Sequence, residues 1–113
     1  MTIKLQQGDL VLVPFPFSDL SAVKSRPALV VSNKTLKGED CILVAVTSQS
    51  SKKNQIKLND HDMAQGSLPV QSYIRPSKII SLKKSIIRRV FGKLKKKKLK
   101  EVEVALFGYL KMK

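Results

Sequence analysis

The sequence predicts a small, mainly β domain of the α+β class, with short helices and one longer helix at the C-terminus. The chain has 113 residues, which suits one domain around a single core, and we treat residues 1–113 as that domain. Its apolar residues fall into short β-branched runs that polar, glycine and proline residues separate. Only the last segment has helical spacing. Many short strands and one terminal helix are typical of a strongly bent antiparallel sheet or barrel.

The first half of the chain contains three expected strands, at 10–15, 27–32 and 41–46. The third is a continuous apolar run, which indicates a central strand buried on both faces. The loop before the second strand ends at Arg26, and the proline that follows biases this arginine toward an extended conformation. A polar segment around Gly38 predicts a turn before the third strand. That strand ends in the hydroxyl-rich loop 47–51.

The second half is more irregular. We expect a short strand at 55–58, a turn of helix within 59–66, and strands at 68–74 and 78–82. Pro76 predicts a break or a bulge between the last two, because proline cannot donate to a sheet ladder. Segment 86–94 is strand-like, with a glycine inside it.

The C-terminal segment is the expected helix. Leu99, Val102, Leu106 and Leu110 recur at intervals of three and four residues. The four lysines 95–98 crowd the end of the helix that already carries positive dipole charge. They therefore either precede the helix or serve an anionic partner.

Charge gives the first indication of a partner. The net charge is +14, from 22 Lys and Arg against 8 Asp and Glu. Eleven basic residues fall between Lys78 and Lys100, and no acidic residue does. Clustered charge of one sign repels itself unless a polyanion neutralises it. The pattern favours a nucleic acid or an acidic protein as partner, and a merely solvated lysine surface is the alternative.

Other classes of protein find little support in the sequence. No run approaches the length of a transmembrane helix, and the N-terminus lacks the apolar region of a signal peptide, so a cytoplasmic location is expected. Cys41 has no second cysteine to pair with, and its apolar neighbours predict a buried, inert thiol. His61, the single histidine, suggests a surface loop residue rather than a metal ligand. Neither a metal nor a cofactor is expected.

Three loops can meet at one end of a small sheet, and they carry Arg26, Thr47 and Arg75. The guanidinium fork matches a phosphate, and hydroxyl groups can hold further phosphoryl oxygens. Such a pocket can stabilise a phosphorane formed when an RNA 2′-hydroxyl attacks its own phosphodiester. The alternative is structural: Arg26 pairs with Asp9 or Asp19, while Thr47 and its neighbour cap a turn. Composition alone therefore indicates a basic, β-rich domain that binds nucleic acid.

At this point the sequence resembles the MazF/PemK family of endoribonuclease toxins from bacterial toxin–antitoxin systems. The resemblance extends from about residue 7 to residue 110, and the order of its short pieces makes it specific. The matching segments are 8–11 (Gly-Asp-Leu-Val), 24–31 (Lys-Ser-Arg-Pro-Ala-Leu-Val-Val), 44–49 (Val-Ala-Val-Thr-Ser-Gln), 72–75 (Ser-Tyr-Ile-Arg), 78–82 (Lys-Ile-Ile-Ser-Leu) and 91–94 (Phe-Gly-Lys-Leu).

The resemblance implies an SH3-like barrel of the MazF/Kid type that forms a homodimer. It also implies metal-independent cleavage of single-stranded RNA (mRNA) through a 2′,3′-cyclic phosphate, and an acidic cognate antitoxin as partner. The catalytic residues of the family match Arg26, Thr47 and Arg75 here. Ser77 stands where many members have an aspartate, so a carboxylate general base is in doubt.

The residues expected to contact RNA are of three kinds. Phe17 and Tyr73 are candidates for base stacking. Ser48 is expected to orient the phosphate, and Gln49 to contact the phosphate or a base. Lys24 and Lys78 add positive charge. The loops 16–25 and 49–54 are expected to set the cleavage sequence.

Two other functions remain open at this stage. A family relative can have lost its activity, with Ser77 as the sign of that loss, and act as a nucleic-acid-binding or gyrase-targeting module. A small RNA-binding barrel of ribosomal type would explain the charge, but not the Arg-Pro and Thr-Ser pairs.

Overall fold

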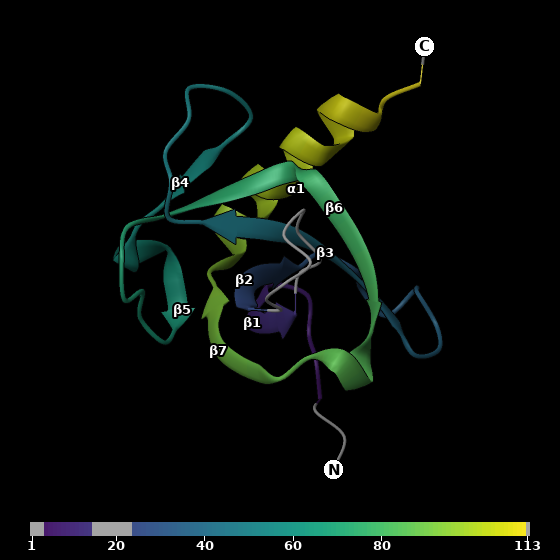
Figure 1. Cartoon of the computed structure of the whole chain (residues 1–113). Helices are drawn as coiled ribbons and strands as arrows, with labels where there is room; N and C mark the ends of the chain where they lie inside the picture. Colours follow the sequence, from purple (N-terminus) through teal and green to yellow (C-terminus); the bar gives the residue numbers. More distant parts are fainter. Residues whose placement is uncertain (1–3, 15–23, 113) are drawn as a thin grey trace.

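The computed structural model of the chain describes residues 4–14 and 24–112, in which seven strands form one antiparallel sheet. The sheet curls into a half-barrel, as Figure 1 shows, and its strand order is β4-β6-β3-β2-β1-β7-β5. The strands are β1 (Asp9–Pro14), β2 (Ser25–Val30), β3 (Asp40–Thr47), β4 (Ile56–Leu58), β5 (Met63–Gln65), β6 (Ser72–Lys83) and β7 (Arg89–Leu94). The mainly β class and the single C-terminal helix predicted from the sequence are confirmed.

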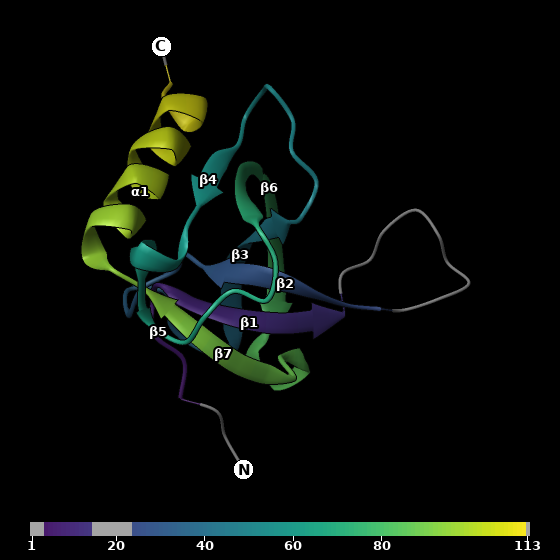
Figure 2. The same cartoon turned by 90° about the vertical axis from the view of Figure 1, so that its left-hand side faces the viewer.

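Helix α1 (Lys96–Leu110) follows β7 directly and lies along one side of the sheet, as the rotated view in Figure 2 shows. Lys96, Lys97 and Lys98 form its first turn. Of the two alternatives for the lysines 95–98, a place before the helix applies only to Lys95, which is the N-cap. Two short 3-10 turns, η1 (Asp60–Asp62) and η2 (Lys84–Ile86), complete the described elements. No helix among the described residues has the length and apolar character needed to cross a membrane.

Strand β6 differs most from the sequence prediction. The segments 68–74 and 78–82 were expected as two strands, but β6 is one strand of 12 residues that begins at Ser72. The predicted effect of Pro76 is confirmed as a bulge, because the register with β3 shifts between the pairs Val44–Ile79 and Ala45–Arg75. Residues 68–71 are outside any strand. Pro69 has no backbone N–H to donate to a neighbouring strand, and the loop around it is exposed.

Smaller differences occur at the ends of elements. Strand β2 begins at Ser25, before Pro27, because Pro14 and Ser25 already pair across β1 and β2. Strand β5 was missed within the expected turn 59–66, where only η1 is helical. Its three residues pair only with β7, so tertiary pairing rather than local pattern makes it a strand.

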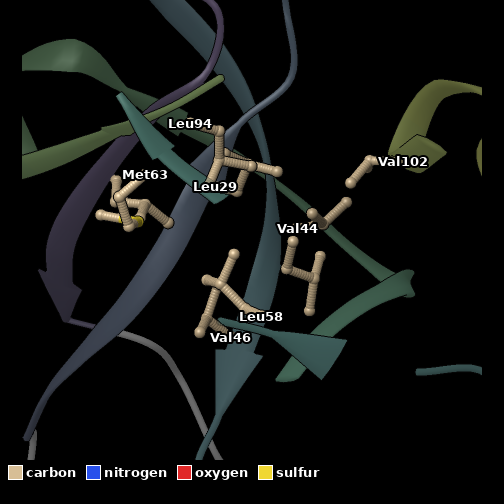
Figure 3. Packing of buried hydrophobic residues seen from close by; sticks show 9 residues of the cluster. Leu29, Val44, Val46, Leu58, Met63, Leu94 and Val102 are labelled. Carbon is tan, nitrogen blue, oxygen red and sulfur yellow. The ribbon is translucent and has the colours of Figure 1, made fainter. Parts of the chain in front are cut away.

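Two hydrophobic clusters occupy the two faces of the sheet. The first contains Leu29, Val44 and Leu58 of the strands, with Val102 reaching in from α1; Figure 3 shows these side chains gathered together. The second cluster lies on the opposite face and contains the alternate residues of the same strands, such as Ala28 and Leu43. Because successive strand residues point to opposite faces, β2 and β3 contribute to both clusters. For β3 this confirms the predicted burial on both faces.

Candidate functional site

A groove of about 840 Å³ opens where β2 begins and β3 ends. It brings together side chains from five strands and from the loop between β5 and β6. Its lining is Leu10, Leu12, Arg26, Pro27, Ala45, Val46, Thr47, Ser48, Gln49, Gly66, Ser67, Leu68, Pro69, Val70, Ser72, Arg75, Arg89 and Phe91.

The register of β2 and β3 explains why Arg26 and Thr47 both reach this groove. Ala28 pairs with Ala45. Arg26 precedes the first of these alanines by two residues, and Thr47 follows the second by two. In an antiparallel pair, equal steps away from a pair keep residues on the same face. The arginine and the threonine therefore lie on one face, at the same end of the sheet.

Arg75 joins them through the next strand pair. It lies opposite Ala45 across β3 and β6, immediately before the bulge. Residues 76–78 have no partner on β3, because Val44 pairs with Ile79. Without the bulge, the register would put Lys78 opposite Ala45. Because of the bulge, Arg75 rather than Lys78 lies opposite Ala45. The hydrogen-bond donors of an arginine have fixed geometry, whereas a lysine side chain is flexible.

The hydroxyl of Thr47 has a defined orientation. Its Oγ1 accepts a hydrogen bond of 3.2 Å from the backbone N–H of Gln49. This is the turn cap that the sequence left open as an alternative. The bond uses a lone pair of the hydroxyl oxygen, so the hydroxyl proton stays available to donate to a ligand in the groove.

The charged side chains in the described lining of the groove are all positive. Arg26, Arg75 and Arg89 line it, and no carboxylate or histidine belongs to its described lining. The neighbouring Arg88 is outside the groove and donates from Nη1 to Ser25 Oγ at 2.6 Å. Three guanidinium groups in one lining favour the binding of an anion, and arginine binds phosphate in bidentate fashion.

Five of the nine residues expected from the sequence meet in this groove: Arg26, Thr47, Ser48, Gln49 and Arg75. Lys24, Tyr73 and Lys78 are described by the structure but do not line it. Tyr73 pairs with both Thr47 and Lys57 between two flanking strands. Phe17 lies outside the described residues, as does most of the loop 16–25.

Sequence reasoning missed two residues of the groove, Arg89 and Phe91. Both are on β7: Arg89 pairs with Leu12, and Phe91 lies at the bulge between the pairs Val11–Val90 and Leu10–Gly92. The signal was available in the alternation of β7, which puts Arg89 on the opposite face from Val90. Leu12 pairs with Arg89 on one side and with Pro27 on the other, so these three residues lie side by side. Arg26 and Pro27 are neighbours on β2 and therefore point to opposite faces of the sheet, yet both line the groove. The groove therefore extends around the strand ends onto the face that carries Arg89.

The residues suggested for other chemistry lie elsewhere. Cys41 is buried at the start of β3, as predicted, and burial raises the pKa of its thiol above the ordinary value of 9.0. His61 is on the exposed surface of η1, with Nε2 3.6 Å from Oδ1 of Asp62. Within residues 4–14 and 24–112, no cluster of three or more His, Cys, Asp or Glu has the arrangement of a metal site.

The curled sheet with its terminal helix is the fold of MazF proteins. A mycobacterial endoribonuclease in complex with its cognate antitoxin superposes with a TM-score of 0.77 at 18% identity, covering 97% of this chain and 98% of that one. The MazE–MazF complex (Form-III) of Deinococcus radiodurans gives 0.75 at 24%, covering 96% and 98%. MazF (Form-I) of the same organism gives 0.74 at 25%, covering 96% and 97%.

A family model extends this likeness from the fold to the sequence. Residues 6–108 match the family described as PemK-like, MazF-like toxin of type II toxin-antitoxin system. The chain therefore belongs to this family, as its resemblance implied. A search of curated protein sequences finds no match.

Proposed function

We propose that the protein is the toxin of a type II toxin–antitoxin system, and that it cleaves single-stranded RNA without a metal ion. The observation that carries the proposal is the presence of Arg26, Thr47 and Arg75 in one groove. Guanidinium groups supply there the positive charge that a cleaved phosphodiester requires. The mycobacterial protein of the same fold is an endoribonuclease, which supports this assignment.

The reaction is an internal transfer within the RNA. The 2′-oxygen forms a bond to phosphorus while the bond to the 5′-oxygen breaks, leaving a 2′,3′-cyclic phosphate and a 5′-hydroxyl. Charge builds up on the phosphoryl oxygens of the intermediate, and Arg26 and Arg75 stabilise it. Thr47 donates its hydroxyl proton to one of these oxygens.

Protons move through water in this scheme. The guanidinium group of an arginine holds its proton too strongly to act as a general base. Water therefore takes the proton from the 2′-hydroxyl and returns one to the departing 5′-oxygen. Ser77 is exposed in the bulge of β6 and replaces the aspartate of other family members, so it supplies no carboxylate base.

The second half of the groove is proposed to hold the flanking nucleotides. Arg89 would bind a neighbouring phosphate, and Phe91 with Leu68 offers an apolar surface for a base. Lys24, Tyr73 and Lys78 stay predicted RNA contacts outside the groove. The base preference of cleavage is assigned to the loops 16–25 and 49–54.

A cognate antitoxin and a second copy of the chain are the proposed protein partners. Two of the solved structures with this fold are toxin–antitoxin complexes. Near the end of α1, Val104, Phe107 and Leu110 expose large apolar side chains. Surfaces of this kind are typical of protein interfaces.

The test is cleavage of a long RNA in EDTA by the wild-type protein and by Arg26→Ala. We expect the wild type to produce fragments whose 5′-hydroxyl ends polynucleotide kinase labels directly, and the variant to lose about 100-fold or more of the rate. An RNA with 2′-O-methyl groups is the matched substrate control, because it has no nucleophile. Equal rates for both proteins would refute the assignment of Arg26.

The second candidate is a family member that binds RNA or another nucleic acid without cutting it. The lack of a carboxylate in the described lining and the serine at position 77 favour it. The same assay separates the two functions, since retention of intact RNA in EDTA supports the binder and fragments support the nuclease.

A further inference from the structure

A second cavity, of about 870 Å³, lies at the other end of β2 and β3 from the groove. The end of β2, the loop 32–38, the start of β3, the end of β7 and the first turn of α1 surround it. The eight residues of β3 separate it from the groove by up to about 23 Å, at about 3.3 Å per residue. A ligand in this cavity therefore leaves the groove open. We call it the lysine cavity.

Positive charge surrounds the lysine cavity. Its lining has one carboxylate, Asp40, and five lysines: Lys34, Lys37, Lys84, Lys93 and Lys96. The ammonium of Lys93 donates to the side-chain oxygen of Gln6. Like charges so close together repel one another, and an anion in their midst relieves the repulsion.

The lysines of α1 differ in whether a carboxylate pairs with them. Lys98 lies 3.5 Å from Asp62 and 3.2 Å from Glu101, and Lys100 lies 2.7 Å from Glu103. In contrast, Lys96 faces the cavity and forms no ion pair with any described residue, and the same holds for Lys34 and Lys37. Two lysines of α1 outside the cavity are thus paired with carboxylates, whereas three lysines of the cavity rim keep a charge that no carboxylate in the described part of the chain pairs with.

The interior of the lysine cavity is aliphatic. Leu5, Leu36 and Leu99 are half-buried there, above the buried Val30 and Leu94. No aromatic side chain belongs to its described lining. Single-stranded RNA is usually held by bases stacked on aromatic rings, whereas an apolar centre with a charged rim is the anatomy of a protein interface. The lining therefore favours a peptide over RNA.

The type of basic residue in the two sites also favours a peptide over RNA in the lysine cavity. Arginines alone carry the positive charge of the groove, and lysines alone carry that of the cavity. Arginine presents a rigid fork that fits phosphate, while lysine is a mobile point charge on a flexible stem. Mobile charges can follow carboxylates whose positions vary along a peptide.

We propose that the lysine cavity binds an acidic peptide segment of a partner protein. One aliphatic side chain of the segment rests on Leu5, Leu36 and Leu99, and its carboxylates meet the lysines of the rim. This site is separate from the groove, so the inference does not depend on RNA cleavage. A partner bound here can hold the protein and still leave the groove accessible.

The experiment measures binding of a short fluorescein-labelled peptide of glutamates around one leucine, by anisotropy. The cavity variant is Lys34→Gln/Lys37→Gln/Lys96→Gln, and the matched control is Lys57→Gln/Lys97→Gln/Lys111→Gln, which removes the same charge from exposed sites outside the cavity and the groove. We expect the cavity variant to bind about tenfold more weakly, since each exposed ion pair accounts for about a twofold change. The control variant should bind like the wild type. Replacing the leucine of the peptide by glutamine should also weaken binding to the wild type.

Four results would overturn the proposal. Equal weakening in the cavity and control variants would show that only overall charge matters. Equal affinity for the leucine and glutamine peptides would show that the proposed aliphatic contact does not contribute to binding. Loss of peptide binding in Arg26→Ala/Arg89→Ala, but not in the cavity variant, would place the peptide in the groove. Weaker binding of 2′-O-methyl RNA by the cavity variant, to the same extent as the peptide, would make the cavity an RNA site.

Discussion

Ala45 of β3 lies opposite Arg75 of β6, and the next pair along these strands, Val44 with Ile79, skips three residues of β6. An odd skip moves each later residue to the other face of the sheet. Ile74 accordingly packs in the first hydrophobic cluster, whereas Ile80 packs against the second. One bulge thus lets a single strand cover both cores and presents Arg75 to the groove.

Thr47 is the first residue to test beyond Arg26. Thr47→Val keeps the shape of the side chain and removes the hydroxyl donor, and we expect a loss of about 100-fold in the cleavage rate at saturating RNA. Thr47→Ser keeps the hydroxyl and should retain most of the rate. Single-turnover cleavage of a labelled RNA measures both. A valine variant that cleaves like the wild type would remove Thr47 from the mechanism.

Arg89 and Arg88 form a matched pair of adjacent, exposed arginines. Only Arg89 lines the groove, while Arg88 is bonded to Ser25. If Arg89 neutralises one RNA phosphate, Arg89→Ala should reduce the slope of log affinity against log salt by about 0.7. Arg88→Ala should leave the slope unchanged. Titrations of 2′-O-methyl RNA at several salt concentrations give both slopes, and equal reductions would mean that only net charge acts.

The sequence predicts a residue of this site where the segment around the residue determines its position, and fails where the position depends on pairing with a distant strand. Arg26 and Thr47 stand beside apolar runs whose pairing follows from strand order, so their meeting could be foreseen. The place of Arg75 could not be derived in this way, because a proline predicts a bulge but not the number of residues it skips. Arg89 was missed for a related reason. The alternation of β7 separates Arg89 from Val90, but only the pair Leu12–Arg89 decides on which face of the sheet Arg89 lies.

Dependence on distant parts of the chain also explains why the sequence left the start of α1 open and missed strand β5. The lysines of 95–98 oppose the helix dipole, so local electrostatics left the start of the helix open. The packing of Leu99 and Val102 against the first cluster outweighs that cost. Strand β5, with three residues, has too little pattern to be seen before its partner β7 is in place.

Cys41 gives a prediction on pH. Burial raises the pKa of its thiol above 9.0, against a smaller opposite effect of the hydrogen bond from Ser32 Oγ, 3.8 Å away. The native thiol is therefore neutral at pH 8, and we expect its labelling by a thiolate-selective reagent to be at least about tenfold slower than in urea. Labelling at the same rate in both states would contradict its burial.

The same shift in pKa predicts a loss of stability at high pH. Below pH 9 both the folded and the unfolded state keep the thiol proton, so the free energy of unfolding is unaffected. Above it the unfolded state loses the proton first, and stability falls as pH rises toward the folded pKa. Cys41→Ala should lack this part of the decline. Urea unfolding at pH 8 and pH 10 measures it, and parallel declines in both proteins would exclude the thiol as the cause.

Gly66 connects the stability of the fold to the shape of the groove. It has a positive φ of 80°, and a Cβ there would lie 2.4 Å from the carbonyl oxygen of Phe91. Gly38 has a similar φ of 92°, with nothing within 4 Å of a Cβ. Gly38→Ala should therefore cost only the backbone strain, about 1 kcal/mol of the free energy of unfolding. Gly66→Ala adds a backbone clash and should cost about 3 kcal/mol.

Urea unfolding of the two variants compares these costs directly. The clash at Gly66 can be relieved only if the loop between β5 and β6 moves away from β7. Because Gly66 and Phe91 both line the groove, this movement should also weaken RNA binding by Gly66→Ala, while Gly38→Ala binds like the wild type. An equal loss of stability in the two variants would mean that the loop yields freely, and the close contact with Phe91 would then have no part in shaping the groove.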